Sequence, residues 1–298
     1  MANGGSGMMR VMIFGCGYSG QAIAEAFKSA GASVSGTVRT PESAEKLAKC
    51  GIKPFIFDGS AFGDELAGEF AEVTHLVQSI PPGGTGDPLL KLMTGRLGAL
   101  CPKLEWIGYL STVGVYGDHG GGWVTEETPG SPIQGRSIER VDTEEAWAAE
   151  GDAVHVPVAR LRLAGIYGPG RNAFVNLARG TARRIIKKDQ VFNRIRVEDI
   201  AGATLFLAER KLGGIYNVTD DEPGPPQDVI VEAARLMGTA PPPEQDYETA
   251  EMTPMARSFY GANKRVSNAK LRAAGFEFRF PNYRMSLAEM WDSGRWKA

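Results

Sequence analysis

Short apolar segments alternate with amphipathic segments through the first half of the chain. Residues 10–14 (RVMIF) form an apolar run that ends in glycines, which predicts a buried strand. In residues 21–30 the apolar side chains recur at helical spacing, and Gly31 follows as a natural helix stop. The same alternation predicts strands at residues 32–38, 53–57, 75–79, 106–110 and 156–163 and a helix at residues 41–50. Apolar strands separated by helices predict the α/β class, with a doubly wound parallel Rossmann sheet buried on both faces.

The pattern becomes less regular after residue 167. Proline and glycine cluster at residues 168–170, 223–226 and 241–243, where turns or linkers are expected, with helices predicted at 199–209 and 227–237. We therefore expect a Rossmann domain over residues 9–167. A smaller α/β lobe on the substrate side would cover residues 168–298, with the chain able to cross back to the sheet. The small, polar residues 1–8 are interpreted as a disordered leader or a cloning remnant.

The charge and the reactive residues narrow the range of partners. The chain has 33 Lys and Arg against 35 Asp and Glu, whereas a nucleic-acid or anionic-membrane partner would favour a basic surplus. No apolar run approaches the roughly 18 residues of a membrane span. Three scattered cysteines without a CxxC pair favour a reducing cytoplasm. Three separated histidines give no metal-ligand spacing. We therefore expect a small-molecule substrate and no metal, and leave a homodimer open.

A glycine-rich segment follows the first predicted strand. Residues 15–20 (GCGYSG) match GxGxxG between a predicted strand and a predicted helix, which is the context that makes the motif informative. Gly15 would make the tight turn, Gly17 would let the backbone reach a pyrophosphate, and Gly20 would let helix and strand pack closely. Tyr18 and Ser19 open the helix, whose unpaired N–H groups and dipole favour an anion. The segment predicts a dinucleotide phosphate site.

The end of the second predicted strand favours NADP(H) over NAD(H). A site for NAD places Asp or Glu about 20 residues past the glycines to hold the ribose hydroxyls, and Arg39 stands there instead. A guanidinium can pair with the 2′-phosphate of NADP; the alternative is a solvated surface arginine. Asp58 ends the third strand and suits the adenine edge, or caps the next helix. The cofactor is also expected to contact the turn after the fourth strand, formed by Ser79, Ile80 and Pro81, although a rigid turn would explain these residues as well.

Later segments resemble the extended short-chain dehydrogenase/reductases. Residues 110–118 (LSTVGVYGD) resemble the serine-rich strand end of that family, and residues 126–129 (EETP) resemble the motif that follows it. Two later family motifs are similar to residues 162–171 (RLAGIYGPGR) and 196–200 (RVEDI), with Arg196 where histidine is more usual. The glycine loop and residues 263–267 (NKRVS) resemble most the atypical, YeeZ-like subgroup. The resemblance runs from about residue 10 to the C-terminus and implies an NAD-dependent epimerase/dehydratase-like fold.

The resemblance also assigns catalytic positions, and two of them carry unexpected residues. In active members a tyrosine transfers the proton, a lysine four residues later lowers its pKa, and a strand Ser or Thr helps to hold the substrate oxygen. Thr112 aligns with that Ser or Thr, with Ser111 beside it. Arg136 stands at the tyrosine position and Arg140 at the lysine position. Because arginine stays protonated near pH 7, Arg136 cannot be a general acid or base, whereas Arg140 could still bond the nicotinamide ribose.

Other residues are candidate substitutes for the missing pair. Tyr260 and Lys264 form a literal YxxxK far past the sheet, which we interpret as a chance match. Tyr116 and Tyr167 end strands at the sheet edge where ligands bind, and each could equally be a packing tyrosine with a satisfied hydroxyl. Several arginines could bind a carboxylate or phosphate if they converged on one cleft. The alternative is that most of them lie on the surface or at an interface. These residues are Arg136, Arg140, Arg162, Arg171 and Arg196.

Two functions are compatible with these features. The leading hypothesis is an NADP(H)-dependent oxidoreductase or epimerase-like enzyme acting on a small, sugar-like or anionic molecule. Thr112 and Ser111 would hold the reacting oxygen, and Arg136 would help electrostatically. The alternative is a non-catalytic NADP(H)-binding sensor or scaffold. The missing tyrosine favours the alternative, while Thr112 favours the enzyme.

Overall fold

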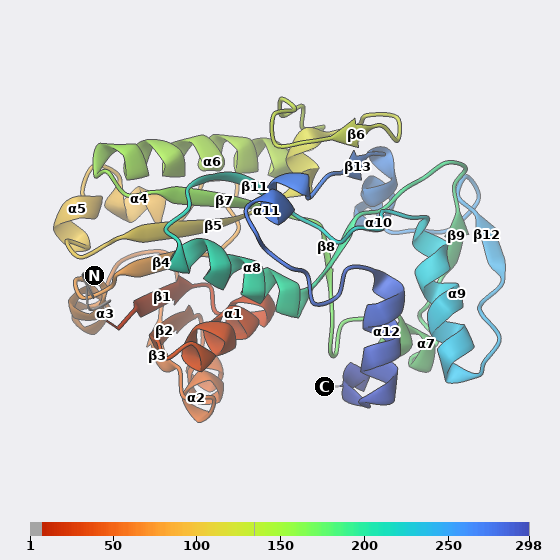
Figure 1. Cartoon of the computed structure of the whole chain (residues 1–298), viewed down its shortest axis with the longest axis horizontal. Coiled ribbons are helices and arrows are strands. Elements are labelled where there is room, and N and C mark those ends of the chain that lie inside the picture. Colours follow the sequence, from red (N-terminus) through yellow and green to blue (C-terminus); the bar gives the residue numbers. More distant parts are fainter. Residues whose placement is uncertain (1–7, 134, 298) are drawn as a thin grey trace. The chain divides into compact units, whose positions relative to one another are not determined.

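Seven strands form the largest sheet of the protein (Figure 1). The structure is a computed structural model that describes residues 8–133 and 135–297, so the leader predicted at residues 1–8 lies, except for Met8, outside the described residues. The strand order is β11-β7-β5-β4-β1-β2-β3, with bounds β1 (Arg10–Phe14), β2 (Ser33–Val38), β3 (Lys53–Ile56), β4 (His75–Gln78), β5 (Trp106–Thr112), β7 (Val158–Leu163) and β11 (Gly214–Val218). The pairs from β3 across to β5 are parallel. This order reverses beside β1, as in a Rossmann sheet. The predicted α/β Rossmann class is confirmed.

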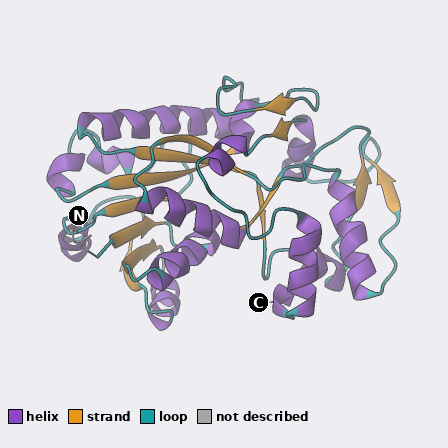
Figure 2. Cartoon of the chain, viewed as in Figure 1, coloured by secondary structure: helices purple, strands orange, loops and turns teal. Residues whose placement is uncertain are grey.

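The chain divides into two compact units, and unit 1 holds residues 8–111, 138–161 and 200–215. Its helices are α1 (Tyr18–Ser29), α2 (Pro41–Lys49), α3 (Asp64–Phe70), α4 (Leu90–Met93), α5 (Leu97–Leu100), most of α6 (Gly135–Ala153) and most of α8 (Val197–Glu209). Figure 2 shows these helices flanking the strands. The predicted helix at residues 41–50 corresponds to α2, which begins at proline behind the Thr40 cap.

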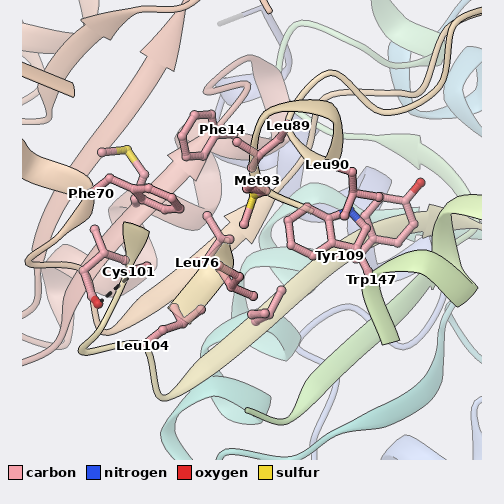
Figure 3. Packing of buried hydrophobic residues seen from close by; sticks show 14 of the residues in the cluster. Phe14, Phe70, Leu76, Leu89, Leu90, Met93, Cys101, Leu104, Tyr109 and Trp147 are labelled. Carbon is pink, nitrogen blue, oxygen red and sulfur yellow. Dashed lines mark hydrogen bonds between the residues drawn. The ribbon is translucent and has the colours of Figure 1, made fainter. Parts of the chain in front are cut away.

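One face of this sheet carries a large apolar core (Figure 3). Met12 and Phe14 of β1 and Leu76 of β4 are fully buried there against side chains of α3, α4, α5 and α6. The alternate residue Ile13 points to the opposite face, where its Cγ2 lies 3.3 Å from the Cβ position of Gly20 in α1. Because both faces of β1 are covered, the strand has to be apolar throughout. This is why its sequence pattern identified it.

Unit 2 holds the described residues within 112–137, 162–199 and 216–297. It contains parallel two-stranded sheets that pair β8 (Gly165–Tyr167) with β10 (Arg194–Arg196), β9 (Arg184–Ile186) with β12 (Glu244–Asp246), and β6 (Trp123–Val124) with β13 (Arg265–Val266). Its helices are α7 (Ala173–Ala178), α9 (Pro226–Met237), α10 (Pro254–Ser258), α11 (Ala269–Ala273) and α12 (Tyr283–Asp292), with 3₁₀ turns η1 (Val113–Tyr116), η2 (Phe259–Gly261) and η3 (Arg295–Lys297). Phe174, Ala233 and Leu287 join α7, α9 and α12 in one apolar core.

The two units interleave along the chain. The sequence placed one boundary at residue 167, whereas the chain leaves unit 1 after Ser111 and returns to it for residues 138–161 and 200–215. The last return brings β11 to the sheet as the neighbour of β7. Its sequence, GIYNV, interrupts the apolar residues with Gly and Asn, and it was not identified as a strand from the sequence. None of the helices in the described part of the chain has the length and apolar character needed to cross a membrane.

Candidate functional site

The glycine loop joins β1 to α1, and two of its glycines are required by close contacts. Gly15 has a φ of +84°, and a Cβ on it would lie 2.8 Å from Ile80 Cγ1. A Cβ on Gly20 would lie 2.8 Å from the carbonyl oxygen of Gly15. Real Cβ atoms do not approach other atoms this closely, so a side chain at either position would displace the loop. The tight turn is at Gly15 and the close approach of helix and strand is at Gly20.

The third glycine faces open space. A Cβ on Gly17 would have no other atom within 4 Å. Gly17 is also the N-cap of α1, and the first turn of that helix has neither a capping side chain nor an acidic residue. The backbone N–H groups at Tyr18 and Ser19 therefore open a 12-residue helix whose positive end is not neutralised by a carboxylate. Room, donors and dipole together fit a phosphate group.

The neighbouring strand β2 holds this loop in place. Thr37 is buried, and its Oγ1 accepts a hydrogen bond from Gly15 N at 2.9 Å. Its carbonyl oxygen accepts from Cys16 N at 2.8 Å. The Cys16 side chain packs on the bare face of Gly36, whose Cβ position lies 2.9 Å from Cys16 Cβ. Thr37 was not singled out from the sequence, although a polar residue inside an otherwise buried strand is a signal for such a role.

The two residues proposed to recognise the adenosine end of the cofactor differ in whether their side chains are hydrogen-bonded within the protein. Arg39 directly follows β2, is exposed, and makes no hydrogen bond or ion pair within residues 8–133 and 135–297. Asp58 is exposed, and its Oδ1 accepts from Ser60 N at 2.9 Å and Ser60 Oγ at 2.6 Å. These bonds hold the pKa of Asp58 below its usual range. Asp58 therefore closes a short turn ahead of α3, while Arg39 is available to a ligand.

The segment after β4 lies against the glycine loop. Ser79 N donates to Phe14 O at 2.9 Å, which extends the pairing of β4 with β1 by one residue. Ile80 comes next and contacts Gly15, as described above. Pro81 completes the turn. Of the three residues predicted to contact the cofactor, Ser79 and Ile80 therefore lie against the glycine loop, and Pro81 follows them.

At the end of β5, the Ser111 hydroxyl is committed to α6. Ser111 Oγ donates to Glu144 Oε1 at 2.5 Å, and both residues are buried. One helical turn earlier, Arg140 Nη1 donates to the carbonyl oxygen of Leu110. Successive turns of α6 therefore bond to successive residues of β5. Ser111 thus has a partner within the protein, and the Arg140 guanidinium binds the strand instead of pointing into solvent. Glu144 was not assigned a role from the sequence.

Thr112 ends β5 beside the start of α6. Its Oγ1 accepts from Gly114 N at 3.1 Å, which caps the η1 turn and leaves the hydroxyl proton available. The Cβ position of Gly114 lies 3.3 Å from Thr112 Oγ1 and 2.9 Å from Ser137 Oγ, so both hydroxyls lie against the same glycine. Arg136 precedes Ser137 in the first turn of α6 and is exposed. The structure thus brings Thr112 and Ser137 together, and Ser137 was not singled out from the sequence.

The hydroxyl groups of both candidate substitute tyrosines are buried. Tyr116 is fully buried, its hydroxyl donates to Asn217 Oδ1 at 2.7 Å, and the Arg162 guanidinium lies 4.7 Å over its ring. These contacts match the packing alternative. The hydroxyl of Tyr167 is also buried, and burial raises its pKa above the usual range, with the nearby Asp220 carboxyl acting in the same direction. A hydroxyl with a raised pKa is a weaker acid, so Tyr167 is poorly suited to donate a proton.

The literal YxxxK of the C-terminal segment does not form a helical pair. Tyr260 lies in η2, whereas Lys264 lies outside any helix, just before β13. Lys264 is buried, and its Nζ donates to the carbonyl oxygen of Gly117 at 2.7 Å. Burial lowers the pKa of Lys264 to about 8. Because the two side chains are not one helical turn apart, the spacing that a Tyr–Lys pair requires is absent here.

Arg196 does not belong to an anion-binding cleft. It is fully buried, and it pairs with Glu198 through Nε at 2.6 Å and with Glu289 through Nη2 at 3.1 Å. Its Nη1 also donates to Ser286 Oγ at 2.9 Å. The side chain has no room for a ligand, so the inclusion of Arg196 among converging arginines is wrong. The physical reason is that two carboxylates already surround the guanidinium.

Comparisons with known proteins place the chain among relatives of the same length. No family model matches it. Protein YeeZ of Escherichia coli K12 is 28% identical over 288 residues, which cover 92% of this chain and 97% of YeeZ. The structure of a functionally unknown conserved protein from Silicibacter pomeroyi is 41% identical, with a TM-score of 0.86, and the match covers 96% of this chain and 99% of that one.

A more distant solved structure shares the fold. The UDP-glucose 4-epimerase of Thermus thermophilus, solved in complex with NAD, is 22% identical with a TM-score of 0.71, covering 94% of this chain and 98% of that one. The Rossmann strand order, the glycine loop and the full-length similarity to YeeZ agree with the motifs read from the sequence. The chain is therefore similar over nearly its whole length to YeeZ and to the conserved protein from Silicibacter pomeroyi, and it has the fold of an extended short-chain dehydrogenase/reductase of the epimerase/dehydratase type.

Proposed function

We propose that the protein binds NADP(H) on its glycine loop and catalyses an oxidoreductase or epimerase-like reaction on a small, sugar-like or anionic molecule. The observation that carries this proposal is the open space at Gly17, at the uncapped N-terminus of α1. A pyrophosphate would be held there by backbone N–H groups and by the helix dipole. The solved epimerase from Thermus thermophilus binds NAD with the same fold.

Arg39 supports NADP(H) as the dinucleotide. Its guanidinium is exposed and has no partner in the described part of the chain. A 2′-phosphate could accept two charge-assisted hydrogen bonds from it, whereas the hydroxyls of a ribose without that phosphate carry no charge to attract it. No acidic residue takes the place that would hold the ribose hydroxyls of NAD.

The residues around Thr112 would act on the substrate. When bound, the nicotinamide would supply or accept a hydride. The Thr112 hydroxyl would donate a hydrogen bond to the reacting oxygen, because its own acceptor role toward Gly114 leaves the proton unused. The exposed charge of Arg136 would stabilise negative charge on that oxygen without moving a proton. Ser137, whose hydroxyl lies against the same glycine as that of Thr112, would relay a proton between that oxygen and water.

A non-catalytic NADP(H)-binding sensor or scaffold is the second candidate. The observation that favours it is the binding of Arg140 to the Leu110 carbonyl, at the position where the family's lysine assists the tyrosine. In this reading α6 is locked to β5 by Arg140 and Glu144, and no residue transfers a proton. The glycine loop would then bind the dinucleotide without turnover.

Binding and turnover separate these candidates. Isothermal titration should show NADPH bound more tightly than NADH, and a screen of carbonyl compounds and sugar nucleotides should reveal NADPH oxidation, NADP⁺ reduction or epimerisation. Tight NADPH binding with no turnover across the screen favours the sensor or scaffold. Equal or tighter binding of NADH contradicts the NADP(H) assignment, and no binding of either dinucleotide contradicts both candidates.

A further inference from the structure

Asp87 is a buried carboxylate held entirely by N–H donors. It is 4% exposed, lies just before α4, and has no Lys, Arg or His within ion-pair distance in the part of the chain that the structure describes. Its oxygens accept from Leu89 N at 2.8 Å, Leu90 N at 3.0 Å and Trp147 Nε1 at 3.2 Å. Gln78 Nε2 lies 2.9 Å from each of the two oxygens. Burial of a carboxylate is unfavourable unless hydrogen bonds of this kind replace water.

This carboxylate fixes the orientation of the Gln78 side-chain amide. A carboxylate offers only acceptors, so Gln78 has to present its NH₂ group to Asp87. Its Oε1 then points the other way, where it accepts from Ile80 N at 3.2 Å. If the amide were reversed, its NH₂ group would face the N–H of Ile80, and neither donor would have an acceptor. Asp87 therefore determines that the Ile80 N–H is bonded.

Ile80 in turn packs against the glycine loop at Gly15. Its N atom lies 3.0 Å, and its Cγ1 lies 2.8 Å, from the Cβ position of Gly15. Gly15 has the positive φ that turns the loop toward α1. Ile80 therefore fills the space beside Gly15 that a side chain would need, so the position of Ile80 limits where the Gly15 turn can lie. Trp147, Asp87, Gln78 and Ile80 form a continuous line of contacts from α6 to this loop.

Figure 3 shows Trp147 among the side chains that fill the core face of the sheet, beside Tyr109 and Leu90. Trp147 is fully buried, and its indole N–H donates to Asp87 Oδ2. The indole thus bonds one carboxylate oxygen, whereas Leu89 N and Leu90 N bond the other. An apolar residue would fill the core equally well but would leave one carboxylate lone pair unbonded.

We propose that Asp87 is a positioning residue for the dinucleotide, which acts on the Gly15 turn through Gln78 and Ile80. This assignment rests on the proposed function, because it presupposes that the loop binds NADP(H). It predicts that the affinity for the dinucleotide depends on which side chain donates and which accepts in the Asp87–Gln78 hydrogen bond, and not only on how well the core is filled.

Asp87→Asn tests the donor and acceptor roles in this hydrogen bond. The new amide places a second NH₂ group against Gln78, so one of the amides turns and the Ile80 N–H loses its acceptor. We expect the Kd for NADPH to rise about tenfold. In the double variant Gln78→Glu with Asp87→Asn, the new amide donates to the new carboxylate, which can again accept from Ile80 N. Because the NH₂ group of the new amide also faces Trp147 Nε1, which stays without an acceptor, the Kd should fall back to about the level expected for Trp147→Phe.

A pair of tryptophan variants controls for core packing. Trp106 and Trp147 are both fully buried, and Trp106 Nε1 donates to Leu212 O at 2.9 Å, outside the line of contacts to the loop. Trp147→Phe should raise the Kd for NADPH severalfold, whereas Trp106→Phe should lower the melting temperature and leave the Kd unchanged. Circular dichroism at the titration temperature verifies that each variant is folded.

The outcomes separate the two proposals. If the unaltered protein binds neither NADPH nor NADH, the proposed function fails and this assignment fails with it. If the unaltered protein binds NADPH and Asp87→Asn binds it equally well, only this assignment is overturned. It is also overturned if Trp106→Phe weakens binding as much as Trp147→Phe, or if the double variant binds no better than Asp87→Asn. A failure of Asp87→Asn to fold leaves the tryptophan pair and the double variant to decide.

Discussion

The glycine loop and the start of α6 are the two places where the family pattern assigns function, and they differ in what would carry that function. In the loop, backbone N–H groups would bind the phosphates, and the absence of side chains at Gly15, Gly17 and Gly20 gives the loop the geometry that this requires. At the start of α6, particular side chains define the chemistry, and arginines occupy both key positions. A chain can therefore keep a backbone-built anion site while it changes the groups that would move a proton.

The largest effect is expected at Gly17. Gly17→Val places a branched side chain in the open space where a pyrophosphate would lie, so NADPH affinity should fall by more than about 100-fold. The fold should survive, because Gly17 has a φ of −85° and no neighbour within 4 Å of its Cβ position. Gly15→Ala is the matched control, since it should also lower the melting temperature through its positive φ and its contact with Ile80. Normal NADPH binding by Gly17→Val would show that the loop is not the phosphate site.

The next largest effect concerns the chemistry beside α6. Thr112→Val should slow the turnover of any substrate found by about 100-fold, since a donor to the reacting oxygen is lost, while Thr112→Ser keeps the hydroxyl and most of the rate. Arg136→Ala should slow turnover about tenfold, and Arg235→Ala, which removes an exposed arginine on α9, should not. Because arginine does not titrate, the rate should lack the pH dependence of a tyrosine–lysine pair. Unchanged turnover in Arg136→Ala would assign that arginine to the surface only.

Arg39 provides a test of cofactor choice within the loop region. Arg39→Asp removes a cation and adds a charge that repels a 2′-phosphate, so the preference for NADPH over NADH should fall about 30-fold or invert. The melting temperature should stay the same, because Arg39 has no partner to lose in the described structure. An unaltered preference, measured by titration with both dinucleotides, would place the 2′-phosphate elsewhere.

The smallest expected effect lies at Ser111. Ser111→Ala leaves the buried Glu144 without one of its donors, which should lower the free energy of unfolding by about 1–3 kcal/mol. Turnover and NADPH affinity should change less than twofold at temperatures where the variant is folded. A loss of turnover comparable to that of Thr112→Val would instead show that Ser111 contacts the substrate. Chemical denaturation and steady-state rates on the same preparation distinguish these results.

Local patterns explain which parts of the structure could be predicted from the sequence. The strand at residues 10–14 and the helix at residues 41–50 are encoded by continuous apolar runs, a cap and a proline, all within a few residues. The glycine loop was identifiable because its contacts depend on its own backbone. The α/β class followed from the alternation of such segments.

The missed residues act across long stretches of chain. Thr37 bonds to the loop from 22 residues away, and Ser111 reaches Glu144 across 33 residues. Arg196 could not be assigned correctly, because one of its carboxylate partners, Glu289, lies 93 residues later in the sequence. A polar residue within a buried segment signals that a partner exists, but one sequence does not identify that partner.

The return of the chain at β11 limits how the half of the protein with the Rossmann sheet could be produced as a separate fragment. A recombinant fragment cut after Tyr167 would lack α8 and β11 and would leave the backbone groups on one edge of β7 open. The indole N–H of Trp106 would also lose the Leu212 carbonyl that accepts it. Such a fragment should aggregate through edge-to-edge strand pairing. Fusing residues 197–218 behind β7 through a short linker should restore the edge strand and yield a monomeric product.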